Sequence, residues 1–449
     1  MQLNTLTAIS PLDGRYRSRV DTLDQYFSEY AYMKYRLTVE IEYFLFLAKE
    51  HFFTLPDKVK KSLKKLEKSF NEKDAFVIKT FEKTTNHDVK AVEYFLKQKL
   101  QELGSEHLTE WIHFGLTSQD INNTAITLLW KKFIHDEYYF FIEALNNHIT
   151  SLAKQWIHIP ILARTHGQPA TPTLLGKELM VFVERIQNQL QLCYQIPFST
   201  KFGGAVGNFN AHRIAFPKKD WVALGNKFVN NILGLQRQQF TTQIEHYDTL
   251  AAHLDNIKRI NTILIDLCRD IWTYISMDYF KQKIKDKEIS SSTMPHKINP
   301  IDFENAEGNL GVANALLEHL SSKLPISRLQ RDLTDSTVLR NIGVPAGHTI
   351  LAIQAIQTGL NKLIIHEQKI KDDLSTNWGV ITEAIQTVLR RENYPKPYEA
   401  LKTLSRKHSH ISKEQLHQFI DQLTISIALK KELKKITPFN YTGILPKIQ

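Results

Sequence analysis

The most constraining feature of this 449-residue sequence is a set of long intervals that contain neither glycine nor proline. The chain has only 17 glycines and 15 prolines, and they cluster in a few segments. Between those clusters, apolar side chains recur every three to four residues, which is the period of an amphipathic helix. Such stretches occupy the middle of the chain, at residues 122–157, 179–193, 250–275 and 353–363. The pattern predicts an all-α protein built around long helices.

Helices of this length predict a bundle, and a bundle that extends beyond one chain. At about 1.5 Å per residue, helices of roughly 25 to 35 residues are rods about 40 to 50 Å long. Rods of that length seldom bury their apolar stripes inside one subunit, so we expect association with other copies. We expect three helical domains: an N-terminal one at 1–108, a central long-helix bundle at 109–365 and a C-terminal one at 366–449.

Composition limits the class of protein. No stretch of about 18 uncharged apolar residues occurs, so no membrane span is expected, and the polar N-terminus does not resemble a secretory signal. The only two cysteines, Cys193 and Cys268, lie in apolar helical stretches, where buried thiols without a metal are expected. These features predict a cytoplasmic protein. The net charge of +10 is compatible with nucleic acid, an anionic membrane surface or an anionic small substrate.

Two loop segments carry residues suited to acid/base chemistry. ARTHGQPATP at 163–172 places His166 in a polar turn, where an imidazole can titrate near neutral pH, and Thr171 followed by Pro172 predicts the start of a helix. EISSSTMPHKINP at 288–300 has few apolar anchors, which predicts a mobile lid. The alternatives are a histidine that bonds only to its own loop and a simple linker.

Three other segments are suited to an anionic ligand. TTNHDVK at 84–90 and HFGLTSQD at 113–120 each precede a predicted helix, where backbone amides favour anions; simple helix capping is the alternative. Arg328, Arg331 and Arg340 flank acidic residues, and arginine binds carboxylates and phosphates in a forked geometry; an internal salt-bridge network is the alternative. Together these patterns predict an acid/base enzyme without metal or cofactor, but they do not name the reaction.

The segment SSTMPHKINP at 291–300 resembles the signature SSxMPxKxNP of the aspartase/fumarase superfamily. Within it, the match is closest to the adenylosuccinate lyase family of the longer bacterial type. Further matches follow in the family's order, from roughly residue 8 to residue 400: SPLDGRY at 10–16, TTNHDVK at 84–90, RTHGQPATP at 164–172, TTQIE at 241–245, IDFEN at 301–305 and RDLTDSTVLR at 331–340.

The resemblance implies a β-elimination of fumarate from adenylosuccinate, giving AMP, and from the succinyl form of aminoimidazole carboxamide ribotide, in purine nucleotide synthesis. It implies that Ser291 is the general base and His166 the general acid. A free hydroxyl is a weak base, so it needs activation by nearby positive charge or amide donors. Lys297 is a candidate for that activation, and with Asn299 it suits the carboxylate-derived dianion.

The resemblance also implies substrate-binding residues and an assembly. The implied contacts are Arg15, Tyr16, Asn86, His87, Asp88, Thr117, Ser118, Gln243, Ser292, Lys297, Asn299, Asn305, Arg331, Ser336 and Arg340. A phosphate of about −1.5 to −2 charge and two carboxylates on the substrate account for a basic site without invoking nucleic acid. The family's active sites combine loops from three subunits of a homotetramer, which agrees with the expectation from the long helices.

One departure and two rival interpretations stay open. Many family members have glycine directly before the two serines of the signature, whereas here it is Ser290, so the register of the base is Ser291 or Ser290. Ser291 lies six residues before Lys297, as the family spacing requires. The rivals are another fumarate-releasing lyase, such as argininosuccinate lyase or fumarase, and a basic helical scaffold without catalysis.

Overall fold

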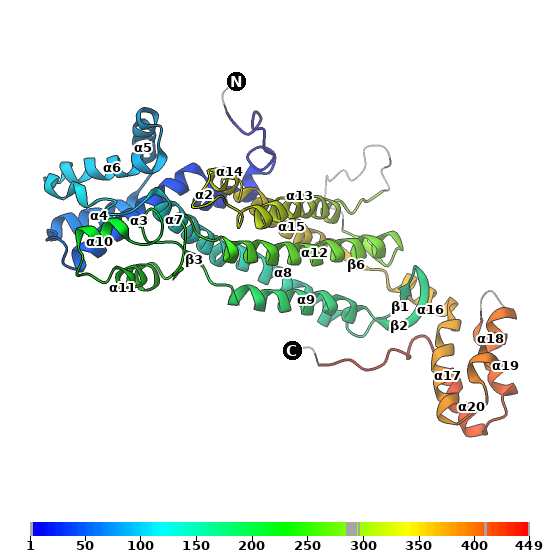
Figure 1. Ribbon diagram of the computed structural model, residues 1–449. Helices are drawn as coiled ribbons and strands as arrows, with labels where there is room; N and C mark the ends of the chain where they lie inside the picture. Colours follow the sequence, from blue (N-terminus) through cyan, green and yellow to red (C-terminus); the bar gives the residue numbers. More distant parts are fainter. Residues whose placement is uncertain (1–2, 284–293, 295–296, 408–410, 448–449) are drawn as a thin grey trace. The chain divides into compact units, whose positions relative to one another are not determined.

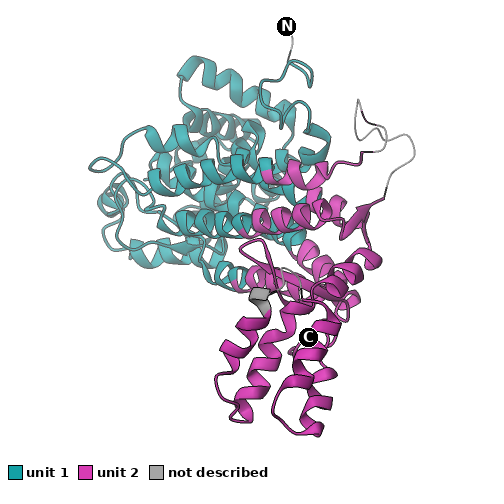
Figure 2. Cartoon of the chain, turned by 90° about the vertical axis from the view of Figure 1, so that its right-hand side faces the viewer, with its two compact units in different colours: residues 1–142, 189–262, 308–354 teal, residues 143–188, 263–307, 355–449 magenta. Residues whose placement is uncertain are grey.

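The computed structural model describes residues 3–283, 294, 297–407 and 411–447. Helices dominate these residues, and the chain divides into two compact units (Figures 1 and 2). Unit 1 comprises residues 1–142, 189–262 and 308–354, and unit 2 comprises residues 143–188, 263–307 and 355–449. The predicted all-α class is confirmed, whereas the predicted domain boundaries near residues 108 and 365 stay a prediction.

The N-terminal part of unit 1 consists of helices that close on an apolar core. Their bounds are α1 Arg17–Val20, η1 Asp21–Leu23, α2 Asp24–Phe27, α3 Glu29–Lys49, α4 Asp57–Ser69, α5 Glu72–Thr85, α6 Asp88–Glu102 and η2 Glu106–Trp111. Leu37 and Phe44 of α3, Leu63 of α4 and Leu96 of α6 are among the buried members of one cluster. The lysine-rich helix α4 buries Val59 and Leu63, as its periodicity predicts, and exposes lysines on its other face.

The rest of unit 1 continues from α7 Ser118–Phe133 into the π-helical turn η3 Ile134–Tyr138. The further elements are β3 Ser199–Thr200, α10 Asn210–Ala215, α11 Trp221–Asn226, η4 Lys227–Ile232, β4 Gln236–Arg237 and α14 Thr334–Leu339. Aromatic side chains join this part to α3: Tyr43 lies edge-on to Phe202 and Phe228. Such aromatic clusters bury a large apolar area and have specific geometry, so they fix the loops at 201–216 against α3.

Long helices carry residues of both units. They are α8 Tyr139–Gln155, α9 Leu175–Gln195, α12 Asp248–Ser276, α13 Ile301–Lys323 and α15 Gly343–Lys362. The predicted stretches 179–193 and 250–275 lie inside α9 and α12, whereas the stretch 122–157 is divided over α7, η3 and α8 and the stretch 353–363 ends one residue beyond α15. In α12, Leu254, Ile257 and Leu264 are fully or almost fully buried, as their spacing of three and seven residues predicts. No helix among the described residues is long and apolar enough to cross a membrane.

Unit 2 adds a hairpin and a group of C-terminal helices. Their bounds are β1 Pro160–Thr165, β2 Gln168–Leu174, β5 Phe280–Gln282, β6 Leu363–Ile365, α16 Glu367–Thr376, η5 Trp378–Ile381, α17 Thr382–Arg391, α18 Pro397–Lys407, α19 Lys413–Gln422 and α20 Ile427–Lys434. The last helices share an apolar core that includes Ile385, Leu416, Ile420 and Leu433. Both cysteines are buried and free, as predicted.

One local prediction is wrong. Thr171 and Pro172 do not begin a helix; they lie in β2, which pairs antiparallel with β1, and α9 begins at Leu175. Pro172 lies opposite Leu162 in this two-stranded sheet. A strand at a sheet edge tolerates proline because its missing N–H is not required by a further neighbour. The pairing with residues 160–165 therefore overrides the local helix-start signal.

Candidate active site

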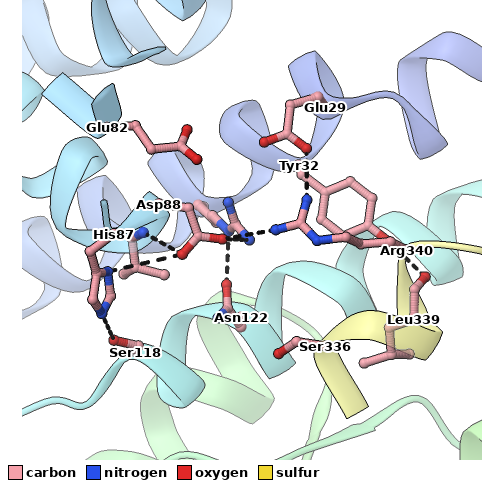
Figure 3. Close-up of polar contacts among 12 residues, drawn as sticks. Glu29, Tyr32, Glu82, His87, Asp88, Ser118, Asn122, Ser336, Leu339 and Arg340 are labelled. Atoms are coloured by element: carbon pink, nitrogen blue, oxygen red, sulfur yellow. Dashed lines mark hydrogen bonds and ion pairs between the residues drawn. The ribbon is translucent and has the colours of Figure 1, made fainter. Parts of the chain in front are cut away.

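A polar cavity of about 340 Å³ lies within unit 1, where the starts of α6 and α7 meet the segment around α14 (Figure 3). Seven of the residues predicted from the family resemblance line it. They are Asn86, His87, Asp88, Ser118, Arg331, Ser336 and Arg340. These residues come from three separate segments of the sequence, and the fold brings the three segments together at one cavity.

The corner at residues 86–88 is formed by the end of one helix and the beginning of the next. Asn86 ends α5 in the left-handed conformation, with φ of 52°, which asparagine adopts more readily than most residues. The N-cap of α6 is His87, whose Nδ1 accepts a hydrogen bond from the backbone N–H of Lys90 at 3.2 Å. Nδ1 is therefore the unprotonated nitrogen of the neutral ring, and the N–H group on Nε2 faces Ser118 Oγ at 3.4 Å.

Asp88 is the most strongly paired acid of the cavity. Its Oδ2 lies 2.8 Å from Arg36 Nη2 and 3.3 Å from Arg340 Nη2, and its Oδ1 accepts the N–H of Val89 at 2.9 Å. Burial alone would raise the pKa of Asp88, but Arg36, the Val89 N–H and Arg340 outweigh it, so the pKa lies below its ordinary value. Asp88 is thus an ionised acceptor that also orients two guanidinium groups.

Ser118 is the first residue of α7, and Thr117 is its N-cap. The Thr117 N–H donates to Asp120 Oδ2 at 2.8 Å, and the Asp120 N–H donates to the Thr117 carbonyl at 2.9 Å. This reciprocal pairing fixes the helix start. Thr117 itself does not line the cavity, but it holds Ser118 there.

Beneath the start of α7 lies a buried ion pair. Asp120 and Lys201 are both fully buried, with Lys201 Nζ 2.7 Å from Asp120 Oδ1. The backbone N–H groups of Gly203 and Gly204 also donate to the Asp120 carboxylate, at 2.8 and 3.1 Å. A buried charge needs such complete pairing to be tolerated. The pair therefore joins the wall of the cavity to the glycine-containing loop after β3.

The arginine-rich segment supplies the cationic side of the cavity. Arg331 Nη2 donates to Ser336 Oγ at 2.9 Å and lies 3.6 Å from Asp335 Oδ1. Arg340 is half-exposed and pairs with Glu29 at 3.0 Å as well as with Asp88. Arg328 instead points to Asp332 at 2.8 Å and is largely exposed. Each of these arginines has an acidic partner, as the salt-bridge interpretation expects. Arg331 and Arg340 also line the cavity, and their binding of an anionic ligand stays a prediction.

The N-terminal motif lies beside this cavity. A smaller cavity of about 240 Å³ is lined by Ser10, Leu12 and Asp13, and it shares Arg340 with the first one. The predicted contacts Arg15 and Tyr16 follow directly in the chain, and neither lines either cavity. Gln243 lies in unit 1 between β4 and α12, half-buried and outside the first cavity.

The predicted acid, His166, belongs to unit 2. It lies in the turn between β1 and β2 with φ of 52°, followed by Gly167 with φ of 74°, and its side chain is exposed. Two consecutive left-handed residues are typical of a two-residue hairpin turn. Arg164, on the same hairpin, lies 3.6 Å from Asp373 of α16. The strand pairing and this ion pair hold the turn that presents the imidazole.

The other predicted residues of the signature region also belong to unit 2. Lys297 is exposed, and Asn299 and Asn305 are half-buried, with Asn305 in the second turn of α13. Ser290, Ser291 and Ser292 lie outside the described residues, as do the other residues of the predicted lid at 288–300 except 294 and 297–300. The role of Ser291 and its register therefore stay a prediction.

Five polar residues of the cavity were not predicted as site residues from the sequence: Tyr32, Arg36, Glu82, Gln119 and Asn122. Tyr32 donates from its hydroxyl to the Leu339 carbonyl at 3.1 Å, and burial raises its pKa to about 12. Arg36 and Tyr32 both belong to α3, whose sequence is mostly apolar. The available signal was the presence of charged residues on the buried face of that helix, at Arg36 and Glu40.

The arrangement is suited to a ligand with several negative charges. Arg331 and Arg340 line the cavity together with the starts of α6 and α7, where the helix dipole also favours anions. Asp88 adds an acceptor for hydroxyl or amine donors of the same ligand. Among the residues that the structure describes, no group of three or more His, Cys, Asp or Glu side chains is arranged to hold a metal ion.

Comparison with known proteins defines the class first. A family model described as "Lyase" matches residues 14–314. The fold is shared with the crystal structure of a fumarate lyase from Mesorhizobium sp. BNC1, with a TM-score of 0.74 and 16% identity over 94% of this chain and 95% of that one. A muconate cycloisomerase from Acinetobacter calcoaceticus aligns with a TM-score of 0.71 and 17% identity, over 94% of this chain and 95% of that one. The chain therefore matches a lyase family over most of its length and shares the fold of these two solved enzymes.

The family within that class follows from closer matches. A model described as "Adenylosuccinate lyase C-terminal" matches residues 327–442. The adenylosuccinate lyase of Dictyostelium discoideum is 59% identical over 99% of this chain and 98% of its own length. That of Escherichia coli K12 is 48% identical over the same shares, and that of Legionella pneumophila strain Corby 49% over 100% and 99%. The chain belongs to the adenylosuccinate lyase family.

Proposed function

We propose that this protein is an adenylosuccinate lyase, which splits adenylosuccinate into AMP and fumarate and also splits the succinyl form of aminoimidazole carboxamide ribotide. The observation that carries the proposal is the single cavity that joins residues 86–88, Ser118 and the 331–340 segment. The substrate has a phosphate of about −1.5 to −2 charge at pH 7 and two carboxylates. Arg331 and Arg340 match those charges in a forked geometry.

The proposed reaction is a general acid/base elimination that needs no metal. A base, Ser291, removes a proton from the carbon next to one succinyl carboxylate. The electron pair of that C–H bond forms the double bond of fumarate as the C–N bond breaks. The electrons of the C–N bond pass to the departing nitrogen, which takes a proton from the acid, His166. Lys297 and Asn299 stabilise the charge that develops on the carboxylate.

We further propose that the working form is a homotetramer whose active sites combine loops from different subunits. The long helices expose large apolar side chains that a partner would cover, including Phe140 at 65%, Trp272 at 45% and Val312 at 48%. A cytoplasmic location accords with the two buried, free thiols. Light scattering on the purified protein tests the assembly: a tetramer is expected, and an active monomer would contradict it.

A direct assay tests the activity. The purified full-length chain is mixed with adenylosuccinate, and the release of fumarate and AMP is followed. We expect turnover of adenylosuccinate and none of argininosuccinate supplied under the same conditions. Release from argininosuccinate alone would assign the chain to another activity of the superfamily. Salt-dependent binding to duplex DNA with no lyase turnover would instead favour the basic-scaffold interpretation.

A further inference from the structure

Helix α3 carries two buried charges one turn apart, and neither belongs to the predicted site. Arg36 is 5% exposed and Glu40 is fully buried. Their neighbours on the helix, Leu37 and Ile41, belong to the apolar core of unit 1. Burying charges in such a helix is costly unless each is fully paired. A helix with a purely structural role would be more stable with apolar residues at both positions. Stability therefore does not explain why Arg36 and Glu40 are charged.

Arg36 connects the starts of the two helices that form the cavity. Its Nη2 lies 2.8 Å from Oδ2 of Asp88, the first residue of α6. Its Nε donates to Oδ1 of Asn122, in the second turn of α7, also at 2.8 Å. One planar guanidinium therefore sets the spacing between α6 and α7, because its donors are in a rigid geometry.

Glu40 makes the corresponding contact one turn further along α3. Its Oε1 lies 2.5 Å from Nδ1 of His113, at the start of the turn that leads to Thr117 and Ser118. His113 Nε2 lies 3.8 Å from Glu93 Oε1 of α6. The α3 helix thus holds both α6 and the turn before α7 through charged contacts, and the residues that these two elements present, His87 and Ser118, face each other at 3.4 Å.

We infer that Arg36 is a positioning residue for nucleotide binding: by holding Asp88 and Asn122 together, it fixes the starts of α6 and α7 at the spacing that the ligand requires. The inference rests on the proposed function of the cavity. Direct substrate binding is not its main role, because its side chain is 6% exposed and two of its three nitrogens already have protein partners. The cationic groups that remain open to a ligand are those of Arg331 and the half-exposed Arg340.

Arg36 has a second effect through charge. Asp88 is partly buried, and burial alone would raise its pKa; Arg36 is the largest of the groups that lower it. The other charged or titratable groups around Asp88 are Arg340, His87 and, lining the same cavity, Tyr32, Glu82 and Arg331. Replacing Arg36 by an uncharged residue leaves all of these in place. The pKa of Asp88 then rises, and nucleotide binding weakens as the pH falls.

The test compares Arg36→Met and Arg36→Lys with a matched control, Arg237→Met. Arg237 is also buried in unit 1 and also has several partners, among them the Phe202 carbonyl at 2.7 Å, but it does not line the cavity. Loss of a charge-assisted hydrogen bond predicts a rise in KM for adenylosuccinate of about 10-fold or more in Arg36→Met. We expect a smaller rise in Arg36→Lys, which keeps the charge but not both contacts, and an unchanged KM in Arg237→Met.

Two further readouts separate positioning from simple support of the fold. KM of Arg36→Met should increase further between pH 8 and pH 5.5 relative to wild type, whereas Arg237→Met should follow the wild-type profile. In a double-mutant cycle, the effects of Arg36→Met and Asp88→Asn on the KM for adenylosuccinate should not add up to the effect of the double variant. Unchanged KM in folded Arg36→Met, or an equal rise in Arg237→Met, would overturn the inference. Failure of the wild-type protein to turn over adenylosuccinate would instead overturn the proposed function.

Discussion

The cavity of unit 1 and the β1–β2 hairpin of unit 2 are built in opposite ways. In the cavity, polar side chains are held from behind by buried partners, such as Arg36 behind Asp88 and the Asp120–Lys201 pair behind the start of α7. On the hairpin, His166 is exposed at a two-residue turn, and its support is the strand pairing and the Arg164–Asp373 contact. Under the proposed function, this difference predicts that the groups of the cavity are preformed for ligand binding within one chain, whereas His166 acts on a ligand that other residues hold. The predictions below test that division.

The hairpin side is tested most strongly by His166→Ala. Loss of a general acid lowers kcat by at least roughly 100-fold, while the cavity is unaffected, so the affinity for AMP should stay the same. Steady-state kinetics and calorimetric titration with AMP measure the two quantities. His158→Ala, another exposed histidine in unit 2, is the control and should keep its activity. Near-normal kcat in the His166 variant would remove this residue from the mechanism.

Substitutions in the signature segment should lower kcat to a similar extent, and they identify which of two serines is the general base. Ser291→Ala should also lower kcat by at least roughly 100-fold, because no other group would accept the proton from the succinyl carbon. Ser290→Ala, one position earlier, should retain most of the activity. The same fumarate assay serves both variants. If Ser290→Ala is the inactive one, the assignment is wrong by one residue.

The cavity side is tested by Arg340→Met. Removal of a guanidinium that faces an anionic ligand should raise KM by about 10-fold to 100-fold, with a smaller change in kcat because the eliminating groups are untouched. Arg328→Met is the matched control from the same segment, since Arg328 is 77% exposed and forms its ion pair with Asp332, outside the cavity. A lower kcat with an unchanged KM would contradict this, because it would mean that Arg340 acts in the elimination step and not in ligand binding.

The smallest effect concerns the backbone that supports Ser118. Gly115 has φ of 70°, and a Cβ there would lie 2.6 Å from His212 Nε2. His212 is fully buried and bonded to Tyr43 at 3.0 Å, so it has little room to move. Gly115→Ala should lower the free energy of unfolding by about 2 kcal/mol and raise KM as the turn shifts.

Gly104→Ala is the control for that change. Gly104 has a similar φ of 71°, but a Cβ there would have no atom within 4 Å. It should therefore show only the conformational cost of about 1 kcal/mol, with KM unchanged. Chemical denaturation measures both variants. Equal losses in the two would mean that the contact with His212 does not fix the turn.

The long helices were predictable from sequence because their information is local. The apolar period of residues 250–275 falls inside α12, and that of residues 179–193 falls inside α9. The hairpin was not predicted, because β2 exists only through its pairing with β1, and Thr171–Pro172 alone favours a helix start. Pairing between segments is a tertiary property that a local pattern does not contain.

The sequence indicated several residues that line the cavity, but not the buried residues that hold them in place. The motif residues at 86–88, 118 and 331–340 were identified by resemblance, and the structure brings them to one cavity. Arg36 was missed because it lies in an apolar helix and matches no motif. Its charge on the buried face of α3, one turn before Glu40, was the one signal present in the sequence.

The most direct test is a crystal structure of the assembled His166→Ala protein with adenylosuccinate bound. We predict that the nucleotide phosphate contacts Arg331 and Arg340 in the unit 1 cavity. We predict that residue 166 and Ser291, from whichever subunits supply them, lie on opposite sides of the succinyl group. A nucleotide bound with its phosphate away from both arginines, or a succinyl group remote from position 166, would contradict the account.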